Sequence, residues 1–113
     1  MYIDHAENVP ERTVHDEGAE KASIRWLISK PQGAPSFAMR LIEVQPGGKT
    51  PFHTHAFEHE VYVLEGQGEV CGASGSWPLR EGSFVLVAPD EEHNFRNTGN
   101  RPLRFICCIP LPP

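Results

Sequence analysis

Hydrophobic and polar residues alternate along several short segments of the chain, and these segments are rich in β-branched and aromatic residues. In the last segment, Leu103, Phe105 and Cys107 share one face, while Ile106 and Cys108 share the other. A period of two is the pattern of a β-strand, and apolar residues on both faces indicate that both are covered. The predicted strands are residues 23–29, 37–45, 61–65, 69–71, 84–88 and 103–109.

Turn-forming residues separate these segments. The 10 glycines and 11 prolines fall mostly between predicted strands, and no segment has the periodicity and caps of a three-turn helix. Short strands with turns between them predict an all-β sandwich or barrel in a single domain. The stretch 84–88 is continuously apolar, which predicts a strand buried on both faces. Residues 1–22 are predicted to form an N-terminal arm and lead-in, and residues 23–113 the barrel domain.

Composition narrows the possible partners. The chain is 39% hydrophobic and 22% charged, as in folded globular domains, and its apolar runs fall far short of the roughly 20 residues that cross a bilayer. Asp and Glu number 15 against 10 Lys and Arg, which gives a formal charge of −5. An acidic chain without a Lys/Arg cluster cannot neutralise phosphates well. We therefore expect neither nucleic acid nor a membrane as partner.

The compartment is predicted from the N-terminus and the cysteines. The first residues lack the basic and apolar regions of a signal peptide, so we expect a cytoplasmic location. The three cysteines, Cys71, Cys107 and Cys108, cannot all pair within one chain, and a bridge between the adjacent two would be strained. We therefore expect reduced thiols.

Four of the six histidines lie in one part of the chain, at His53, His55, His59 and His93. Residues two apart on a strand project from the same face, so His53 and His55 can offer two ring nitrogens to one ion at about 2 Å each. The three residues between His55 and His59 allow a bend that returns the chain to the same place. His93, from a later strand, would complete the set across a barrel. Neutral imidazole suits Zn, Cu, Fe and Ni, and Mn is compatible with octahedral coordination.

The spacing from Gly47 to Gly66 resembles the first motif of the cupins. Five residues separate Gly47 from His53, His55 follows after one residue, and His59 after three more. Six further residues lead to Gly66. The residue before this last gap is usually glutamate in that motif, and here it is His59.

A second resemblance begins at Gly82. Five residues lead from Gly82 to a turn that ends at His93, and Asn97 follows after three more. This stretch is similar to the second cupin motif, except that Ala88 stands where proline is usual and Asp90 where glycine is usual. Both replacements are compatible with a turn.

The resemblance implies a small double-stranded β-helix, the jelly-roll barrel of the cupins, with a metal ion inside. It implies that His53, His55, His59 and His93 hold one divalent transition-metal ion, as in small bacterial cupins with four-histidine sites. We expect Mn or Fe, with Zn, Ni or Cu as alternatives. The same resemblance implies a homodimer.

Glu60 is an alternative ligand to His59. It lies an odd number of residues from His55, whereas His59 lies an even number away and keeps the six-residue spacing to Gly66. We therefore assign His59 as the ligand and expect Glu60 to have a structural role outside the barrel.

The predicted site suggests several functions. Four neutral ligands leave the charge of a divalent ion uncompensated, and an octahedral ion keeps two positions open for water, substrate or dioxygen. Phe95, Phe105, Cys107 and Arg40 are the candidate pocket residues, with Arg40 as an anchor for an anion. The leading hypothesis is a metal-dependent, dioxygenase-like oxidoreductase that acts on a small, partly apolar molecule. The alternatives are a Lewis-acid isomerase or lyase for a sugar or small acid, and a non-catalytic protein that binds a small molecule.

A small barrel exposes sheet edges and an apolar outer face, which dimerisation would cover. Ile106 and Cys108 point outward if Phe105 and Cys107 point inward. These two outward residues are therefore the expected contacts of the homodimer.

Overall fold

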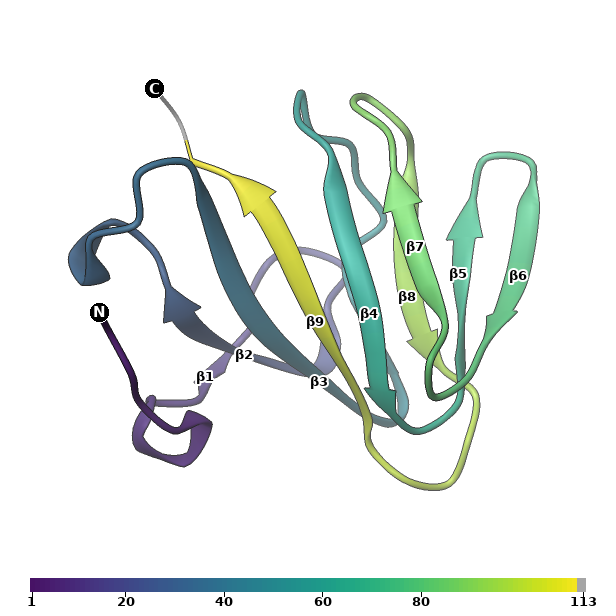
Figure 1. Ribbon diagram of the computed structural model, residues 1–113. Helices are drawn as coiled ribbons and strands as arrows, with labels where there is room; N and C mark the ends of the chain where they lie inside the picture. The colour runs from purple at the N-terminus through teal and green to yellow at the C-terminus, as the bar shows by residue number, and fades with distance from the viewer. Residues whose placement is uncertain (112–113) are drawn as a thin grey trace.

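The computed structural model describes residues 1–111 and consists mainly of strands (Figure 1). Its described residues contain no α-helix, only two short 3₁₀ turns. The elements are η1 (Ala6–Asn8), β1 (Arg12–Thr13), β2 (Glu20–Ile28), η2 (Lys30–Gln32), β3 (Phe37–Lys49), β4 (His59–Glu65), β5 (Gly68–Gly72), β6 (Gly75–Leu79), β7 (Phe84–Val87), β8 (His93–Asn97) and β9 (Leu103–Pro110). The strands form one curled antiparallel sheet in the order β6-β5-β8-β3-β9-β4-β7, with β2 paired to β3 and β1 to β2. The predicted all-β fold is confirmed.

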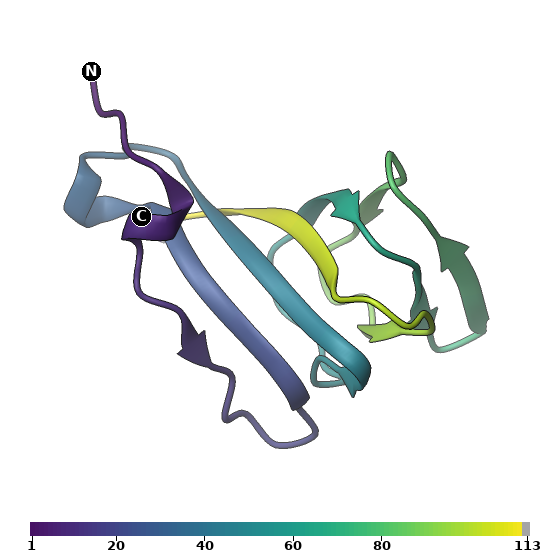
Figure 2. The same ribbon diagram turned by 90° about the horizontal axis from the view of Figure 1, so that it is seen from below.

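Strand β3 is the longest and joins the two parts of the barrel. It pairs with β9 from Phe37 to Val44, and its last residue, Lys49, pairs with Arg96 of β8. Gly48 lies at the bend between these pairings, where a Cβ would be only 2.6 Å from a carbonyl oxygen of β2. Glycine at this position therefore lets β3 turn from one part of the sheet into the other. Figure 2, seen from below, shows that the two long strands β2 and β3 extend to one side of the curled strands.

Alternate residues of β9 fill the barrel interior. Leu103, Phe105 and Cys107 are at most 2% exposed and belong to the main hydrophobic cluster. Ile106 and Cys108, on the opposite face, are half-buried. The alternation in the sequence therefore predicted correctly which residues of this strand enter the core.

The prediction that residues 84–88 form a strand buried on both faces is wrong. Val87 is buried, but Phe84 is 81% exposed and Leu86 is 68% exposed. The reason is that β7 lies at the end of the sheet and pairs only with β4. Its outer face continues onto β4, where the half-exposed Tyr62 lies opposite Phe84. The continuous apolar run of residues 84–88 therefore forms an apolar outer surface of the sheet.

None of the six predicted strands corresponds to β6 or β8, although the histidine pattern already placed His93 on a strand. Strand β6 contains Pro78, which is tolerated because β6 is an edge strand paired only with β5. Strand β8 is polar in sequence and yet mostly buried. Its Asn97 is satisfied by donating from Nδ2 to the carbonyl oxygens of Val44 and Arg101, both at 2.8 Å.

The segment predicted as an arm, residues 1–22, contains η1, β1 and the start of β2. Arg12 and Thr13 pair with β2, and Ala22 is buried. The arm thus extends the sheet beyond β3. The barrel domain predicted for residues 23–113 ends with Pro112 and Pro113, which lie outside the described residues.

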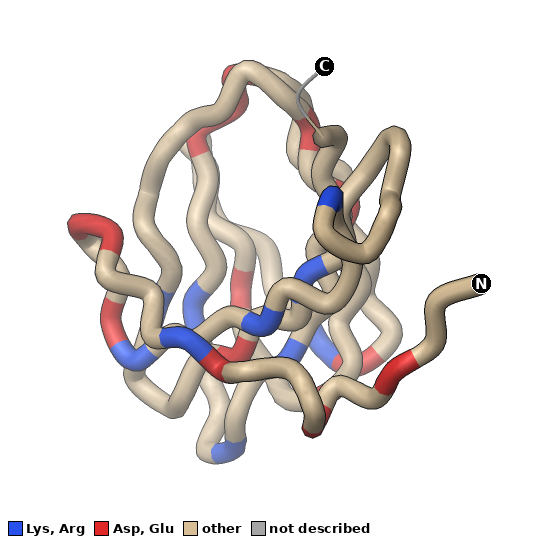
Figure 3. Tube along the Cα trace, turned by 90° about the vertical axis from the view of Figure 1, so that its left-hand side faces the viewer, with Lys and Arg blue, Asp and Glu red and all other residues tan. Residues whose placement is uncertain are grey.

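Charged residues of both signs are interspersed along the chain trace (Figure 3). Among residues 1–111, three ion pairs join strands or the arm and a fourth, Arg101–Glu81, joins two loops; each contributes at most about 1 kcal/mol. Across residues 1–111, no helix has the length and hydrophobicity needed to cross a membrane.

Candidate metal site

His53 and His55 lie in the loop between β3 and β4, and not on a regular strand as predicted. His53 forms an isolated antiparallel bridge with His93: each backbone N–H donates to the other residue's carbonyl oxygen, at 3.2 and 3.1 Å. The carbonyl oxygen of His55 accepts the N–H of Asp90 at 2.6 Å. These backbone hydrogen bonds hold the loop against the turn before β8, so both histidines still face His93.

The turn that contains Asp90 keeps the backbone conformation of a glycine. Asp90 has a φ of 65°, in the left-handed region that glycine adopts freely and aspartate tolerates better than most residues. The second cupin motif usually has glycine at this place. The aspartate therefore preserves the turn that brings His55 and His93 together.

Three imidazole rings converge inside the barrel. The Nε2 atoms of His53 and His55 are 3.0 Å apart, and one ligand atom from each of His53, His55 and His93 lies within 4.8 Å of the others. Nδ1 of His93 is 2.9 Å from the carbonyl oxygen of Glu91. Because a carbonyl oxygen only accepts, this bond places the hydrogen on Nδ1 and leaves the Nε2 lone pair for a metal. The triad therefore fits a metal ion.

His59 lies beside this triad, at the start of β4. Its ring centroid is 4.9 Å from that of His55 and 5.0 Å from that of His93. The side chain is 5% exposed, and its Nε2 is buried without a hydrogen-bond partner. A buried nitrogen without a partner is costly unless something binds it. A metal ion shared with the triad would satisfy it.

Glu60, the alternative ligand, is exposed on the outer side of β4. It lies opposite Cys108 of β9 and Leu86 of β7, and borders a surface hollow with Phe37. The alternation of β4 thus separates it from the inward-facing His59.

The histidines border a cavity of about 110 Å³ inside the barrel. Phe95, Phe105, Cys107 and Arg40, the four pocket residues expected from the sequence, all line this cavity. The rings of Phe95 and Phe105 pack with their centroids 4.8 Å apart. The cavity therefore combines an aromatic wall, one cation and the histidine cluster.

The sequence pattern did not single out several other residues of the cavity. Val14 and Asp16 come from the segment predicted as a polar arm. Val14 is one of the few apolar residues of that segment, and such residues are the sign in the sequence that the arm packs against something. Asp16 is the only carboxylate among the described residues that line the cavity. The remaining unpredicted residues are Ile24, Ile42, Thr50 and Pro51.

Arg40 is held between two side chains that lie opposite it on neighbouring strands, Trp26 on β2 and Cys107 on β9. Its Nη2 donates to Sγ of Cys107 at 2.9 Å, and its guanidinium carbon is 5.3 Å from the centroid of the Trp26 ring. Burial raises the pKa of the Cys107 thiol, so the sulfur is uncharged at neutral pH. Arg40 is therefore a fixed positive charge in the cavity wall.

Three histidines of the site, His53, His55 and His59, are neutral at physiological pH. Burial, together with the smaller effect of the positive charge of Arg40, lowers the pKa of His59 to about 3. Burial and the neighbouring His55 lower the pKa of His53 to about 4, and burial also lowers the pKa of His55. Neutral imidazoles are the form that binds metal.

The same shifts predict how the stability of the metal-free protein depends on pH. Unfolded histidines have a pKa near 6.5, so below this pH the unfolded chain binds protons that the folded His53 and His59 do not. The free energy of unfolding should therefore fall between pH 7 and 5.5, by about 1 kcal/mol for His59 alone. Urea unfolding in the presence of a chelator measures this, and a stability that is constant or rises over this interval would contradict it.

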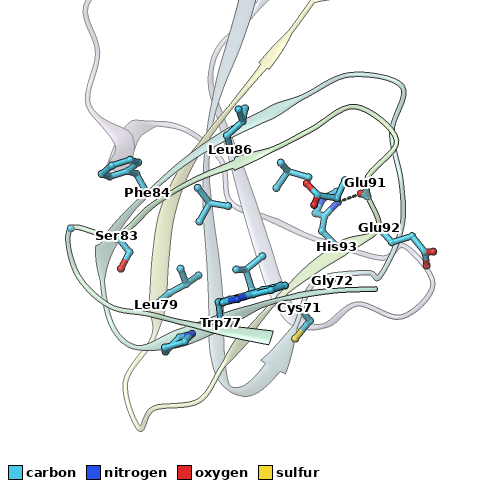
Figure 4. Close-up of a pocket in the computed structure, with 15 residues that line it drawn as sticks. Cys71, Gly72, Trp77, Leu79, Ser83, Phe84, Leu86, Glu91, Glu92 and His93 are labelled. Carbon is cyan, nitrogen blue, oxygen red and sulfur yellow. Dashed lines mark hydrogen bonds between the residues drawn. The ribbon is translucent and has the colours of Figure 1, made fainter. Parts of the chain in front are cut away.

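A larger hollow of about 510 Å³ lies between the β5–β6 hairpin and β7 (Figure 4). Trp77, Phe84 and Leu86 are among the residues that line it. This hollow has fewer side chains available for a reaction than the inner cavity. The carboxylate Oε1 of Glu91 accepts the N–H of Ala88, and Nδ1 of His93 is already bonded to the Glu91 carbonyl oxygen. Size alone therefore does not make this hollow the reactive site.

Fold and site together define a small jelly-roll barrel with a histidine cluster inside. The chain belongs to the cupin family, whose cupin-domain model matches residues 40–109. The expected double-stranded β-helix is confirmed.

Several proteins with recorded roles are similar to this chain. The polyketide cyclase RemF from Streptomyces resistomycificus superposes with a TM-score of 0.91 and 32% identity, over 97% of this chain and 79% of RemF. The polyketide synthase CurC from Streptomyces cyaneus is 36% identical over 72% of this chain and 54% of CurC. The oxalate-binding protein of Thermotoga maritima is 29% identical over 98% of this chain and 94% of that protein. The chain spans only about half the length of CurC and of other curated relatives.

Proposed function

We propose that this protein is a metal-dependent cupin enzyme that acts on a carbonyl or enol group of a small, partly apolar molecule, as a cyclase of the polyketide type does. The observation that carries the proposal is the convergence of histidines beside Arg40 in a cavity with aromatic walls. The similarity to RemF over nearly the whole chain supports this choice of substrate class.

In this proposal His53, His55, His59 and His93 hold one divalent transition-metal ion, with Mn or Fe favoured and Zn, Ni or Cu as alternatives. When bound, such an ion supplies Lewis acidity toward a carbonyl oxygen, and Mn or Fe also supplies redox capacity. Because no carboxylate is among the four side chains, its positive charge is not compensated by the ligands.

The side chains around the cavity provide the rest of the chemistry. Arg40 adds a positive charge that stabilises negative charge on a substrate oxygen as an enolate forms. Phe95 and Phe105 bind the apolar part of the substrate and exclude water from it. Asp16 is the carboxylate that takes a proton from the carbon next to the carbonyl group and returns it to the product.

A dioxygenase-like oxidation is the second candidate. It is favoured by the donor set, because imidazole ligands suit redox-active iron as well as zinc. The two functions differ in their need for oxygen, since proton transfer and carbon–carbon bond formation at a carbonyl consume none.

The experiment compares Zn-loaded and Fe-loaded protein, with and without oxygen, on a small aromatic poly-β-ketone. Oxygen-independent turnover with either metal is the expected result, and Asp16→Asn should lower it roughly 100-fold at unchanged metal content. Turnover that requires both iron and oxygen would replace the proposal with the dioxygenase. Saturable binding without turnover, of this ketone or of a small acid such as oxalate, would instead make the protein a non-catalytic binder.

We also propose that the protein is a cytoplasmic homodimer. The apolar outer face includes Tyr62, Phe84 and Leu86, and Ile106 and Cys108 continue it on β9. A second copy on this face would remove its most exposed apolar side chains from water. Light scattering at micromolar concentration tests this, and a monomer mass would contradict it.

A further inference from the structure

A group of three side chains, Arg40, Cys107 and His59, connects the barrel wall to the histidine cluster. Sγ of Cys107 is 2.9 Å from Nη2 of Arg40 and 3.1 Å from Nδ1 of His59. Cys107 is 2% exposed and His59 is 5% exposed, so water does not compete for these contacts. Cys107 takes no part in the function proposed above, and its position needs a separate explanation.

The hydrogen-bond roles in this group follow from what each atom can do. A guanidinium only donates, so the bond from Arg40 makes the Cys107 sulfur an acceptor. The same sulfur can then accept the Nδ1–H of His59. The contact between Arg40 Nη2 and His59 Nδ1 is longer, at 3.4 Å. If Arg40 instead donated to Nδ1, the hydrogen of a neutral His59 would sit on Nε2, which is buried and has no acceptor.

We propose that Cys107, itself held by Arg40, is a positioning residue that keeps the hydrogen of His59 on Nδ1 and thereby turns the Nε2 lone pair toward the metal. This role rests on the metal site proposed above. It parallels the bond between His93 Nδ1 and the carbonyl oxygen of Glu91, which fixes the same tautomer on that histidine. His93 is oriented by the backbone, whereas His59 depends on side chains that substitution can remove.

Arg40 is the part of this group that fixes the sulfur. Trp26 and Cys107 are its direct cross-strand partners, and the Trp26 ring packs against the guanidinium. Losing the arginine should therefore free the sulfur to rotate and should weaken the hold on His59.

The test replaces Cys107 by valine, which keeps the volume and removes the acceptor, and by serine, which restores an acceptor. Cys71→Val is the control, since that thiol lies on β5 outside the metal cavity. Cobalt(II) affinity is measured by competition with a chelator, and the visible spectrum of bound cobalt reports its coordination. Long-range ¹H–¹⁵N spectra of the metal-free protein report the tautomer of His59, because in that state no metal ion fixes it.

Cys107→Val is expected to bind cobalt about 10- to 100-fold more weakly, the usual cost of removing a group that orients a ligand, and to change the cobalt spectrum. Cys107→Ser should recover most of the affinity, and Cys71→Val should match the wild type. Thermal unfolding with a chelator shows whether each variant is folded. If Cys107→Val does not fold, the tautomer of His59 in the wild type decides, and a hydrogen on Nε2 would overturn the role.

Failure of this role can be told apart from failure of the proposed metal site. If His59→Ala weakens metal binding while Cys107→Val has wild-type affinity and spectrum, only the positioning role is wrong. If His59→Ala binds like the wild type, His59 is not a ligand and the role falls with it. A wild-type protein that takes up no cobalt would overturn both.

Discussion

Replacing His93 by alanine is expected to abolish stoichiometric metal binding. His93 contributes the central ring of the cluster: it pairs with His53 through the backbone, and its tautomer is fixed by the Glu91 carbonyl. Removing a group that merely orients a ligand costs about 10- to 100-fold in affinity, so removing the ligand itself should cost more than about 100-fold. Metal analysis after dialysis, with zinc affinity from chelator competition, measures the loss.

The matched control for this variant is His15→Ala, which removes a histidine from outside the cavity. It should keep wild-type metal content. Circular dichroism of both variants with a chelator separates loss of metal from loss of fold. A folded His93→Ala protein that holds one metal ion with wild-type affinity would contradict the assignment.

Replacing Gly66 by alanine is expected to cause the largest loss of stability among single substitutions in the turns. Gly66 has a φ of 91°, and a Cβ there would collide with the carbonyl oxygen of Pro102 and lie 2.9 Å from Cα of Leu103. The left-handed strain costs about 1 kcal/mol, and overpacking against backbone adds about 1–3 kcal/mol. The expected loss is about 3 kcal/mol, which would lower Tm by more than about 10 °C.

Gly82→Ala is the matched comparison for that substitution. Gly82 has a φ of 88°, close to that of Gly66, but a Cβ there would meet nothing within 4 Å. Its replacement should therefore cost only the strain, about 1 kcal/mol. Equal losses of Tm in the two variants would show that the close approach of Gly66 to the β8–β9 connection does not matter.

The sequence predicted the parts of the fold that depend on local alternation. Strand β9 is the best example, because Phe105 and Cys107 are buried and Ile106 and Cys108 lie on the other face. The prediction failed for residues 84–88, because an apolar run cannot reveal whether a strand is central or at the edge. The hydrophobic pattern did not reveal strand β8, because its buried residues include asparagines. These asparagines are stabilised by hydrogen bonds to distant parts of the chain.

The candidate site, like the fold, was only partly predictable from the sequence. The spacing of the histidines pointed to one cluster, although a backbone bridge, and not a regular strand, aligns His53 with His93. The pairing of Arg40 with Cys107 depends on the register between β3 and β9, which residue spacing does not contain. The approach of Asp16 to the cavity depends on how the arm packs, and a polar segment gives little sign of that.

The central claim is that four histidines of this barrel share one metal ion. The most direct measurement is an anomalous difference map from crystals of the protein loaded with manganese or zinc. We predict one peak inside the barrel, about 2 Å from a ring nitrogen of each of His53, His55, His59 and His93. A peak bound by Glu60 or by surface carboxylates, or no peak within reach of these rings in fully loaded protein, would contradict the account.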